Sequence, residues 1–184
     1  IAGFVLSCVG DELQYSHIAS RKENTISDLA LSAAISYKRN FKYYSFTERG
    51  SDERQFCAPG IDLPVCGFCK SKYLEYKEYH TNADNFKLVT KKGLEESFIV
   101  MSNIIQAFEN TLYPKTQTLC EPMLSKRNLY PSVSKKDLRE TTRINIIAYS
   151  DGLNSVFEIA LKLKISLSKI LEEINILKQS GLIK

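Results

Sequence analysis

The alternation of hydrophobic and polar positions divides the first 112 residues into short strands and longer helices. An apolar run over residues 2–9 predicts a strand buried on both faces, and shorter apolar runs predict strands over 41–46 and 63–68. Apolar residues at three- and four-residue steps predict helices over 25–38 and 92–112. This order is typical of an α/β sheet flanked by helices, in which ligand sites lie in loops at strand ends.

The pattern changes after Pro114, where the chain becomes irregular and proline-rich. From residue 136 onward the periodicity is purely helical, with Asp151-Gly152 as a turn signal and Ser166 as a helix cap. The expected helices cover residues 136–149, 154–163 and 166–180. We therefore predict two domains, residues 1–130 and residues 131–184, the second a small all-α module like the core of a winged helix, with Gly181 as C-cap and Leu182-Ile183 beginning the wing.

The third of these helices would be the DNA-reading helix of such a module. Its expected core face carries Leu167, Ile170, Leu171, Ile174 and Leu177. Its expected outer face carries Ser168, Lys169, Glu172, Glu173, Asn175, Lys178 and Gln179. Adjacent glutamates repel phosphates, and this face offers no arginine to read guanine. The sequence therefore argues against DNA binding and favours a protein contact, either with the preceding domain or with a second copy of the chain.

Candidate chemistry gathers in the segment Glu78-Tyr79-His80-Thr81-Asn82-Ala83-Asp84, which precedes the long helix. A neutral imidazole is a good zinc ligand, and an oxygen acceptor commonly orients such a ligand. Asp84 or Asn85 could instead cap the following segment. Tyr73, Tyr76 and Tyr79 could line a pocket near this loop or serve only in packing. A lone histidine in a loop is more often an ordinary surface residue.

This segment resembles the last metal-ligand motif of the zinc aminopeptidase superfamily that includes bacterial leucyl aminopeptidases and glutaminyl cyclases. A second stretch, Gly50-Ser51-Asp52-Glu53-Arg54-Gln55-Phe56, followed by Gly60-Ile61-Asp62-Leu63-Pro64, resembles another motif of the same group. It is most similar to a poorly characterised bacterial branch whose members end in a winged-helix-like domain. The resemblance spans nearly the whole chain and implies part of a mixed sheet flanked by helices.

The resemblance also implies roles for individual residues. His80 would be a zinc ligand, and Asp52, Glu53, Arg54 and Asp84 would bind substrate or support the site. The intact protein would hold one or two zinc ions and hydrolyse a peptide or aminoacyl amide by metal-assisted attack of water. Glu53 stands where the wider superfamily often has histidine, so its role does not carry over. The alternatives without a functional role are that residues 52–54 are a solvated charge cluster and that Asp84 only begins a helix.

Several residues that this metal site needs are missing from the chain. The superfamily uses a further histidine, a bridging aspartate and a Glu-Glu pair upstream of these motifs, whereas this chain has only His17 and His80. Ser7 or Cys8 stands where double-zinc members carry an aspartate ligand, which favours a single zinc. We therefore expect the chain to be the C-terminal half of a longer enzyme, with no complete set of catalytic residues of its own.

Composition sets broader limits. The net charge of +4 and the pI near 8.7 fall short of a nucleic-acid-binding footprint, and no apolar run is long enough for a membrane span. Five cysteines at irregular spacings do not form a disulfide framework, so a reducing cytoplasm is expected. Cys57, Cys66, Cys69 and His80 could form a structural zinc site. However, Cys66 and Cys69 lie in a predicted strand, where they would point to opposite faces.

A different functional class stays open at this point. The protein could be a non-catalytic binding or scaffold protein, in which the metal loop is inherited but inactive and the winged helix recruits a protein or nucleic-acid partner. A His/Asp pair and a Glu-Glu pair upstream of Ile1 would favour the enzyme, and their absence would favour the scaffold.

Overall fold

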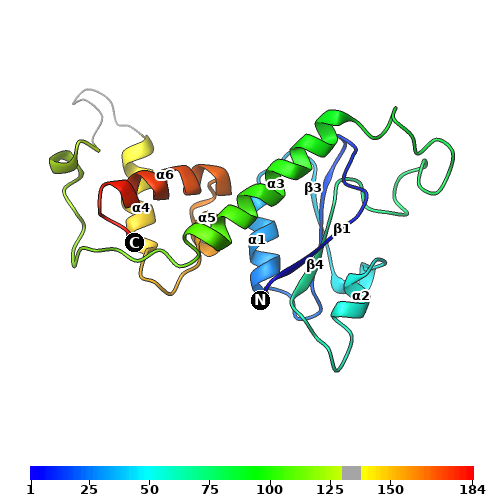
Figure 1. Cartoon of the computed structure of the whole chain (residues 1–184), viewed down its shortest axis with the longest axis horizontal. Helices are drawn as coiled ribbons and strands as arrows, with labels where there is room; N and C mark the ends of the chain where they lie inside the picture. Colours follow the sequence, from blue (N-terminus) through cyan, green and yellow to red (C-terminus); the bar gives the residue numbers. More distant parts are fainter. Residues whose placement is uncertain (130–137) are drawn as a thin grey trace. The chain divides into compact units, whose positions relative to one another are not determined.

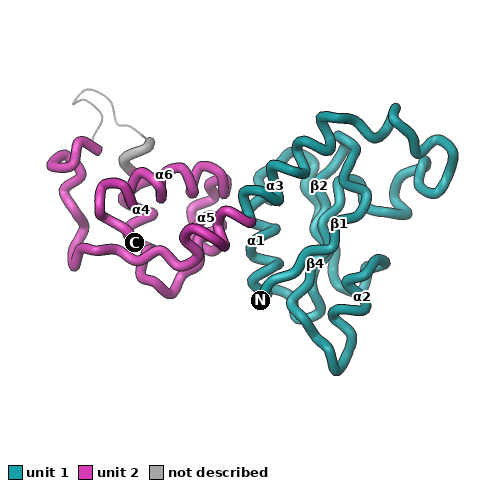
Figure 2. The backbone as a smooth tube through the Cα atoms, in the orientation of Figure 1, with its two compact units in different colours: residues 1–104 teal, residues 105–184 magenta. Residues whose placement is uncertain are grey.

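The computed structural model describes residues 1–129 and 138–184, and the side chains of residues 138–140 are not described. Two compact units divide the chain, Ile1–Ile104 and Ile105–Lys184, coloured separately in Figure 2. The predicted domain boundary at residues 130/131 falls on the undescribed segment and stays a prediction. In the described part, no helix is long and apolar enough to cross a membrane.

The first unit is built on a mixed four-stranded sheet in the order β1-β4-β2-β3. Its strands are β1 (Gly3–Leu6), β2 (Tyr15–Ile18), β3 (Phe41–Tyr44) and β4 (Val65–Cys69). β1 runs parallel to β4, and β2 runs parallel to β3 and antiparallel to β4. The parallel pairing of β1 and β4 brings their carboxyl ends to the same edge of the sheet, where the following loops meet.

Helices cover both faces of this sheet. α1 (Ile26–Ile35) and the short α2 (Glu53–Phe56) lie on opposite sides of it (Figure 1). α1 begins at a capping box in which Thr25 and Asp28 satisfy each other's backbone N–H groups. A 3₁₀ helix, Phe46–Glu48, separates β3 from α2. The fold is therefore the predicted α/β class, and the buried cores lie on both sides of the sheet.

α3 (Lys91–Asn110) begins beside the loop that follows β1. The hydroxyl of Thr90 accepts a hydrogen bond from the backbone N–H of Gly93 at 2.9 Å, so Thr90 caps this helix. Of the two residues expected to cap the segment after the His80 loop, Asn85 accepts the backbone N–H of Lys87 with its side-chain oxygen at 3.0 Å. A side chain at position 93 would meet the carbonyl oxygen of Gly10 at 2.1 Å. Only glycine lets the first turn approach that loop so closely.

The sequence prediction differs from the observed sheet at two strands. β2 was not predicted, because it is short and carries the polar residues Ser16 and His17, although every residue in it is buried. β1 was expected to be buried on both faces, but it lies at the edge of the sheet and Leu6 is 51% exposed. An apolar sequence alone does not distinguish an edge strand from a central one.

The second unit contains α4 (Leu138–Tyr149), α5 (Val156–Leu163) and α6 (Leu167–Gln179), preceded by the 3₁₀ helix Leu124–Arg127. Ser155 and Ser166 cap α5 and α6 with their hydroxyls. The predicted helix over 136–149 is described from residue 138. Gly181 follows α6 with a φ of +69°, as its predicted C-cap role requires. The last residues then pair with the segment before the helices, Lys115 exchanging two backbone hydrogen bonds with Lys184.

Candidate functional site

A cavity of about 320 Å³ opens at the carboxyl ends of β1 and β4. Two loops and the first turn of α3 form it: residues 8–11, which follow β1, and the long loop between β4 and α3. The polar side chains on its wall are Cys8, Asp11, Tyr76, Tyr79 and Asp84, and the apolar ones are Val9, Leu88, Val89 and Leu94. The cavity therefore lies where ligand sites are expected in such sheets.

Tyr76 connects the two sides of this cavity. Its hydroxyl lies 3.2 Å from Oδ2 of Asp84 and 3.4 Å from Sγ of Cys8, so its single hydrogen can be donated to either acceptor. Burial raises the pKa of Tyr76, and hydrogen bonding to Cys8 and the charge of Asp84 raise it further. Tyr76 therefore stays protonated near neutral pH and acts as a donor that holds the Asp84 carboxylate at the cavity.

His80 lies next to this cavity. It is exposed, has a φ of +58°, and its ring stacks on Tyr79 with centroids 4.0 Å apart. In the described part of the chain, neither of its ring nitrogens forms a hydrogen bond. Tyr79 itself lines the cavity, so the stacking places an accessible imidazole beside the wall that Tyr76 and Asp84 form.

The described residues do not complete a zinc site around His80. Among them, only one group of three histidine, cysteine or acidic side chains lies close enough to hold a metal: His17, Asp28 and Cys66, with ligand atoms within 4.8 Å of one another. That group is buried and excludes His80. A zinc ion at His80 would need ligands from residues other than these.

The buried group around His17 is already satisfied by protein contacts. His17 Nε2 lies 3.0 Å from Asp28 Oδ1, and its Nδ1 lies 3.0 Å from the Ser32 hydroxyl. Burial raises the pKa of the Cys66 thiol well above its usual value, which keeps it protonated and a poor metal ligand. These contacts are those of a structural polar cluster beneath α1. Sequence reasoning missed the cluster because it missed β2.

The triplet Asp52-Glu53-Arg54 does not act as one group. Asp52 and Arg54 are exposed, whereas Glu53 is fully buried. Glu53 Oε1 accepts hydrogen bonds from the backbone N–H groups of Gly50 and Ser51 and from the Tyr73 hydroxyl, each at 3.0 Å. Its other oxygen is buried without a partner among the described residues. Glu53 thus fixes the conformation of the loop before α2, and the alternative of a wholly solvated cluster is wrong for this residue.

The cysteines and His80 do not come together as a Cys₃His site. The Cys57 thiol donates to the carbonyl oxygens of Leu63 and Val65. Cys69 packs with Ile18, Tyr44 and Tyr73 on one side of the sheet, while Cys66 lies in the His17 cluster on the other. The expectation that Cys66 and Cys69 point to opposite faces is therefore confirmed.

In the second unit, α6 buries the predicted core residues Leu167, Ile170, Leu171, Ile174 and Leu177. The expectation that Glu173 lies on the outer face is wrong, since its side chain is only 1% exposed. Glu173 pairs with Arg143 of α4 at 2.7 Å and with Lys169 at 2.9 Å. An arginine from a neighbouring helix provides the charge that lets this glutamate be buried, and sequence periodicity could not reveal that partner.

Comparison with known proteins adds the family. The model described as "Domain of unknown function (DUF4910)" matches residues 1–111, and the model described as "winged helix-turn-helix" matches residues 111–184. A Clostridium acetobutylicum protein named "Putative polysaccharide biosynthesis protein with aminopeptidase-like domain" is 34% identical over 169 residues, covering 87% of this chain and 38% of that protein.

A solved structure described as a "putative peptidase" from Clostridium acetobutylicum superposes with a TM-score of 0.79 at 29% identity. The match covers 100% of this chain and 41% of that one, so the chain spans about two-fifths of the length of the relatives it matches. The chain has a mixed four-stranded α/β sheet followed by a winged helix-turn-helix region, and it belongs to the family described as Domain of unknown function (DUF4910).

Proposed function

We propose that this chain provides one wall of the active site of a peptidase-like protein that hydrolyses the amide bond of a peptide or aminoacyl amide. The observation that carries the proposal is the cavity at the ends of β1 and β4, where Cys8, Tyr76 and Asp84 converge beside the stacked Tyr79 and His80. Similarity to proteins described as a peptidase and as aminopeptidase-like supports the reaction class.

Each polar residue of the wall has a role in this proposal. Asp84, held by Tyr76, faces the cavity as a carboxylate suited to the free amino group of a substrate. His80 supplies one zinc ligand, and the remaining ligands come from parts of the longer protein outside this chain. Glu53 is a positioning residue that holds the Gly50-Ser51 loop before α2, and the exposed Asp52 and Arg54 on either side of it would contact substrate.

Asp84→Asn tests the proposal in the protein as its gene encodes it. The substitution removes the negative charge but keeps an acceptor for Tyr76, so folding should be preserved. We expect the KM for aminoacyl amides to rise about tenfold or more, because a charge-assisted hydrogen bond to the substrate amine is lost. Steady-state hydrolysis of a series of aminoacyl amides measures this.

Asp62→Asn is the matched control, because Asp62 is an acidic loop residue that pairs with Arg21 and Lys22 and does not line the cavity. It should leave the KM unchanged. Hydrolysis that is insensitive to Asp84→Asn would refute the role of Asp84. A complete lack of hydrolysis by the wild-type protein would overturn the proposed reaction and favour the scaffold alternative.

A further inference from the structure

A second cavity of about 360 Å³ lies in the first unit. Its wall includes Gln14 and Asn40 from the ends of the β2 and β3 strands, Lys42 of β3, and Lys72, Glu75 and Tyr76 from the loop after β4. None of the candidate site residues Asp52, Glu53, Arg54, His80 or Asp84 lines it. Only Tyr76 is shared with the cavity described above.

The feature of interest in this cavity is the Lys72 side chain. Lys72 is 7% exposed, and its ammonium lies over the rings of Tyr73 and Tyr44, at 4.7 Å and 5.1 Å from their centroids. In the described part of the chain it has no ion-pair or hydrogen-bond partner. Its Nζ atom keeps some access to the cavity that it lines, so an anion in the cavity can reach it. Aromatic faces compensate only part of the cost of removing a cation from bulk water.

Lys70, in the same segment, is a buried lysine whose contacts can be compared with those of Lys72. It is fully buried two residues earlier and also stacks on an aromatic ring, that of Tyr15 at 3.6 Å. Unlike Lys72, it has a carboxylate partner, with Nζ 2.7 Å from Glu96 Oε2. Lys72 thus has aromatic contacts like those of Lys70 but no carboxylate partner among the described residues.

Among the described residues no carboxylate forms an ion pair with Lys72, although the buried Glu53 accepts a hydrogen bond from the hydroxyl of the neighbouring Tyr73. Burial and hydrogen bonding to Glu75 raise the pKa of Tyr44 to about 12, and burial and the charge of Glu53 raise the pKa of Tyr73 as well. Both phenols therefore stay neutral near pH 7. Glu75 is held by the Tyr44 hydroxyl and by Lys42, whose ammonium lies 3.5 Å from it. The charges of Lys42 and Glu75 offset each other, which leaves Lys72 as the net charge of the cavity.

We propose that this cavity binds the oxyanion group of a small molecule, a carboxylate or a phosphate, with the Lys72 ammonium as its counter-charge. The rings of Tyr44 and Tyr73 hold the ammonium in a low-dielectric setting, where pairing with an anion is strengthened. The amide of Asn40 lines the same cavity; one of its N–H groups donates to the carbonyl oxygen of Leu13 at 2.9 Å, and the amide carries a second N–H as a neutral donor. The proposal does not depend on peptidase activity.

Titration of the full chain with inorganic phosphate and, separately, with acetate tests this site, with sodium chloride at matched ionic strength as reference. Binding is followed by the rise in melting temperature. Lys72→Met keeps the packing against the tyrosine rings and removes the charge. We expect it to weaken binding about tenfold or more. Lys72→Arg should retain binding, and Lys87→Met, which changes an exposed lysine outside the cavity, should have no effect.

A measurement on the wild-type chain covers the case in which Lys72→Met does not fold. With ¹³C-labelled lysine, the Cε signal of Lys72 should shift saturably on adding the bound anion, while that of the already paired Lys70 should not. Saturation by phosphate alone would assign a phosphate-bearing ligand, and saturation by acetate alone a carboxylate. A response no larger than that to chloride for both anions, or unchanged affinity in Lys72→Met, would overturn the proposal.

Discussion

At the scale of single residues, the structure gives most of its buried polar groups specific partners. Asp28 is the clearest case, because it accepts from His17, from the backbone and hydroxyl of Ser20, and from the backbone and hydroxyl of Thr25. Burial by itself raises the pKa of Asp28, but these hydrogen bonds outweigh it and hold the pKa below its ordinary value of 3.8.

Asp28→Asn should therefore destabilise the fold in a pH-dependent way. A carboxyl whose pKa is lower in the folded than in the unfolded chain stabilises the fold above the unfolded pKa, and this contribution is lost as pH falls through the folded value. We expect the variant to lose about 3 kcal/mol of unfolding free energy at pH 7. The difference from wild type should shrink as the pH falls below about 4. Urea unfolding across this pH range measures it.

Asp62→Asn again provides the matched control, since Asp62 is an acidic loop residue whose partners Arg21 and Lys22 are largely exposed. Its effect at pH 7 should be much smaller, because surface ion pairs contribute little. If Asp28→Asn lowers the unfolding free energy by the same amount at pH 7 and at pH 3, the charge of Asp28 does not explain its contribution to stability.

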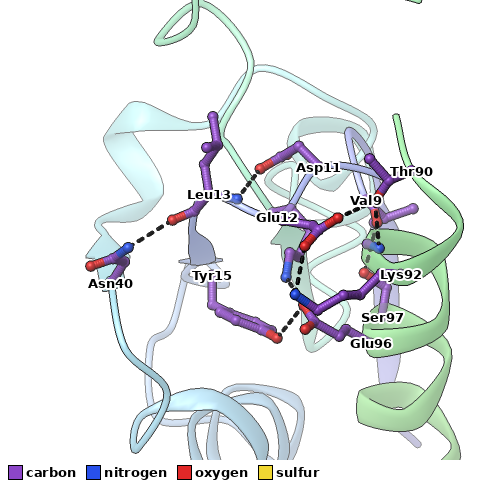
Figure 3. A network of polar contacts seen from close by, with 12 residues as sticks. Val9, Asp11, Glu12, Leu13, Tyr15, Asn40, Thr90, Lys92, Glu96 and Ser97 are labelled. Atoms are coloured by element: carbon purple, nitrogen blue, oxygen red, sulfur yellow. Dashed lines mark hydrogen bonds and ion pairs between the residues drawn. The ribbon is translucent and has the colours of Figure 1, made fainter. Parts of the chain in front are cut away.

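At the scale of elements, a polar network fastens the beginning of α3 to the sheet. Glu96 of α3 accepts from the Tyr15 hydroxyl of β2 at 2.8 Å and from Lys70 at 2.7 Å, and the Ser97 hydroxyl donates to the carbonyl oxygen of Val9 (Figure 3). Lys92 and Thr90 both contact Glu12 at the outer end of this network. The inner contacts involve the fully buried Lys70, whereas the outer ones face solvent.

Glu96→Gln should consequently cost about 2 kcal/mol of unfolding free energy, because it leaves the Lys70 ammonium buried without its counter-charge. Lys92→Met, one turn earlier on the same helix but in an exposed pair with Glu12, should change stability little. Chemical denaturation of both variants and of the double variant Lys70→Met/Glu96→Gln checks this. If Glu96→Gln costs no more than Lys92→Met, the buried pair does not fasten α3.

The sequence predicted the long periodic elements well and the short polar ones poorly. α3 and α6 both show apolar residues at three- and four-residue spacing. The core residues predicted for α6 are buried. β2 has no such pattern, since Ser16 and His17 are buried through contacts with Lys70, Ser32 and Asp28. Partners distant in sequence decide such burial, as they also do for Glu173 and Arg143.

The candidate site was predictable in location but not in composition. The loop around His80 and Asp84 does meet the end of β1, as an α/β arrangement implies, and Tyr76 and Tyr79 line the cavity there. The bond from Tyr76 to Cys8 joins residues 68 positions apart and could not be inferred from spacing. The environment of Lys72 could likewise not be predicted from the sequence, because a lysine in a loop is expected to be solvated.

At the scale of the whole molecule, the chain joins a DUF4910 domain to a winged helix-turn-helix region and spans 38% and 41% of the two relatives it matches. The described residues place one exposed histidine beside the cavity without further ligands. We therefore propose that, in the protein as its gene encodes it, His80 is one ligand of a metal whose other ligands lie outside these residues.

Zinc content by elemental analysis after dialysis tests that claim most directly, comparing the encoded wild-type protein with His80→Ala and with Lys87→Ala, an exposed residue of the same loop. We predict about one zinc or more per wild-type chain, retention in Lys87→Ala, and loss of most of the metal in His80→Ala, because losing one of three or four ligands weakens zinc binding strongly. Wild-type protein without zinc, or His80→Ala with its zinc intact, would contradict the account.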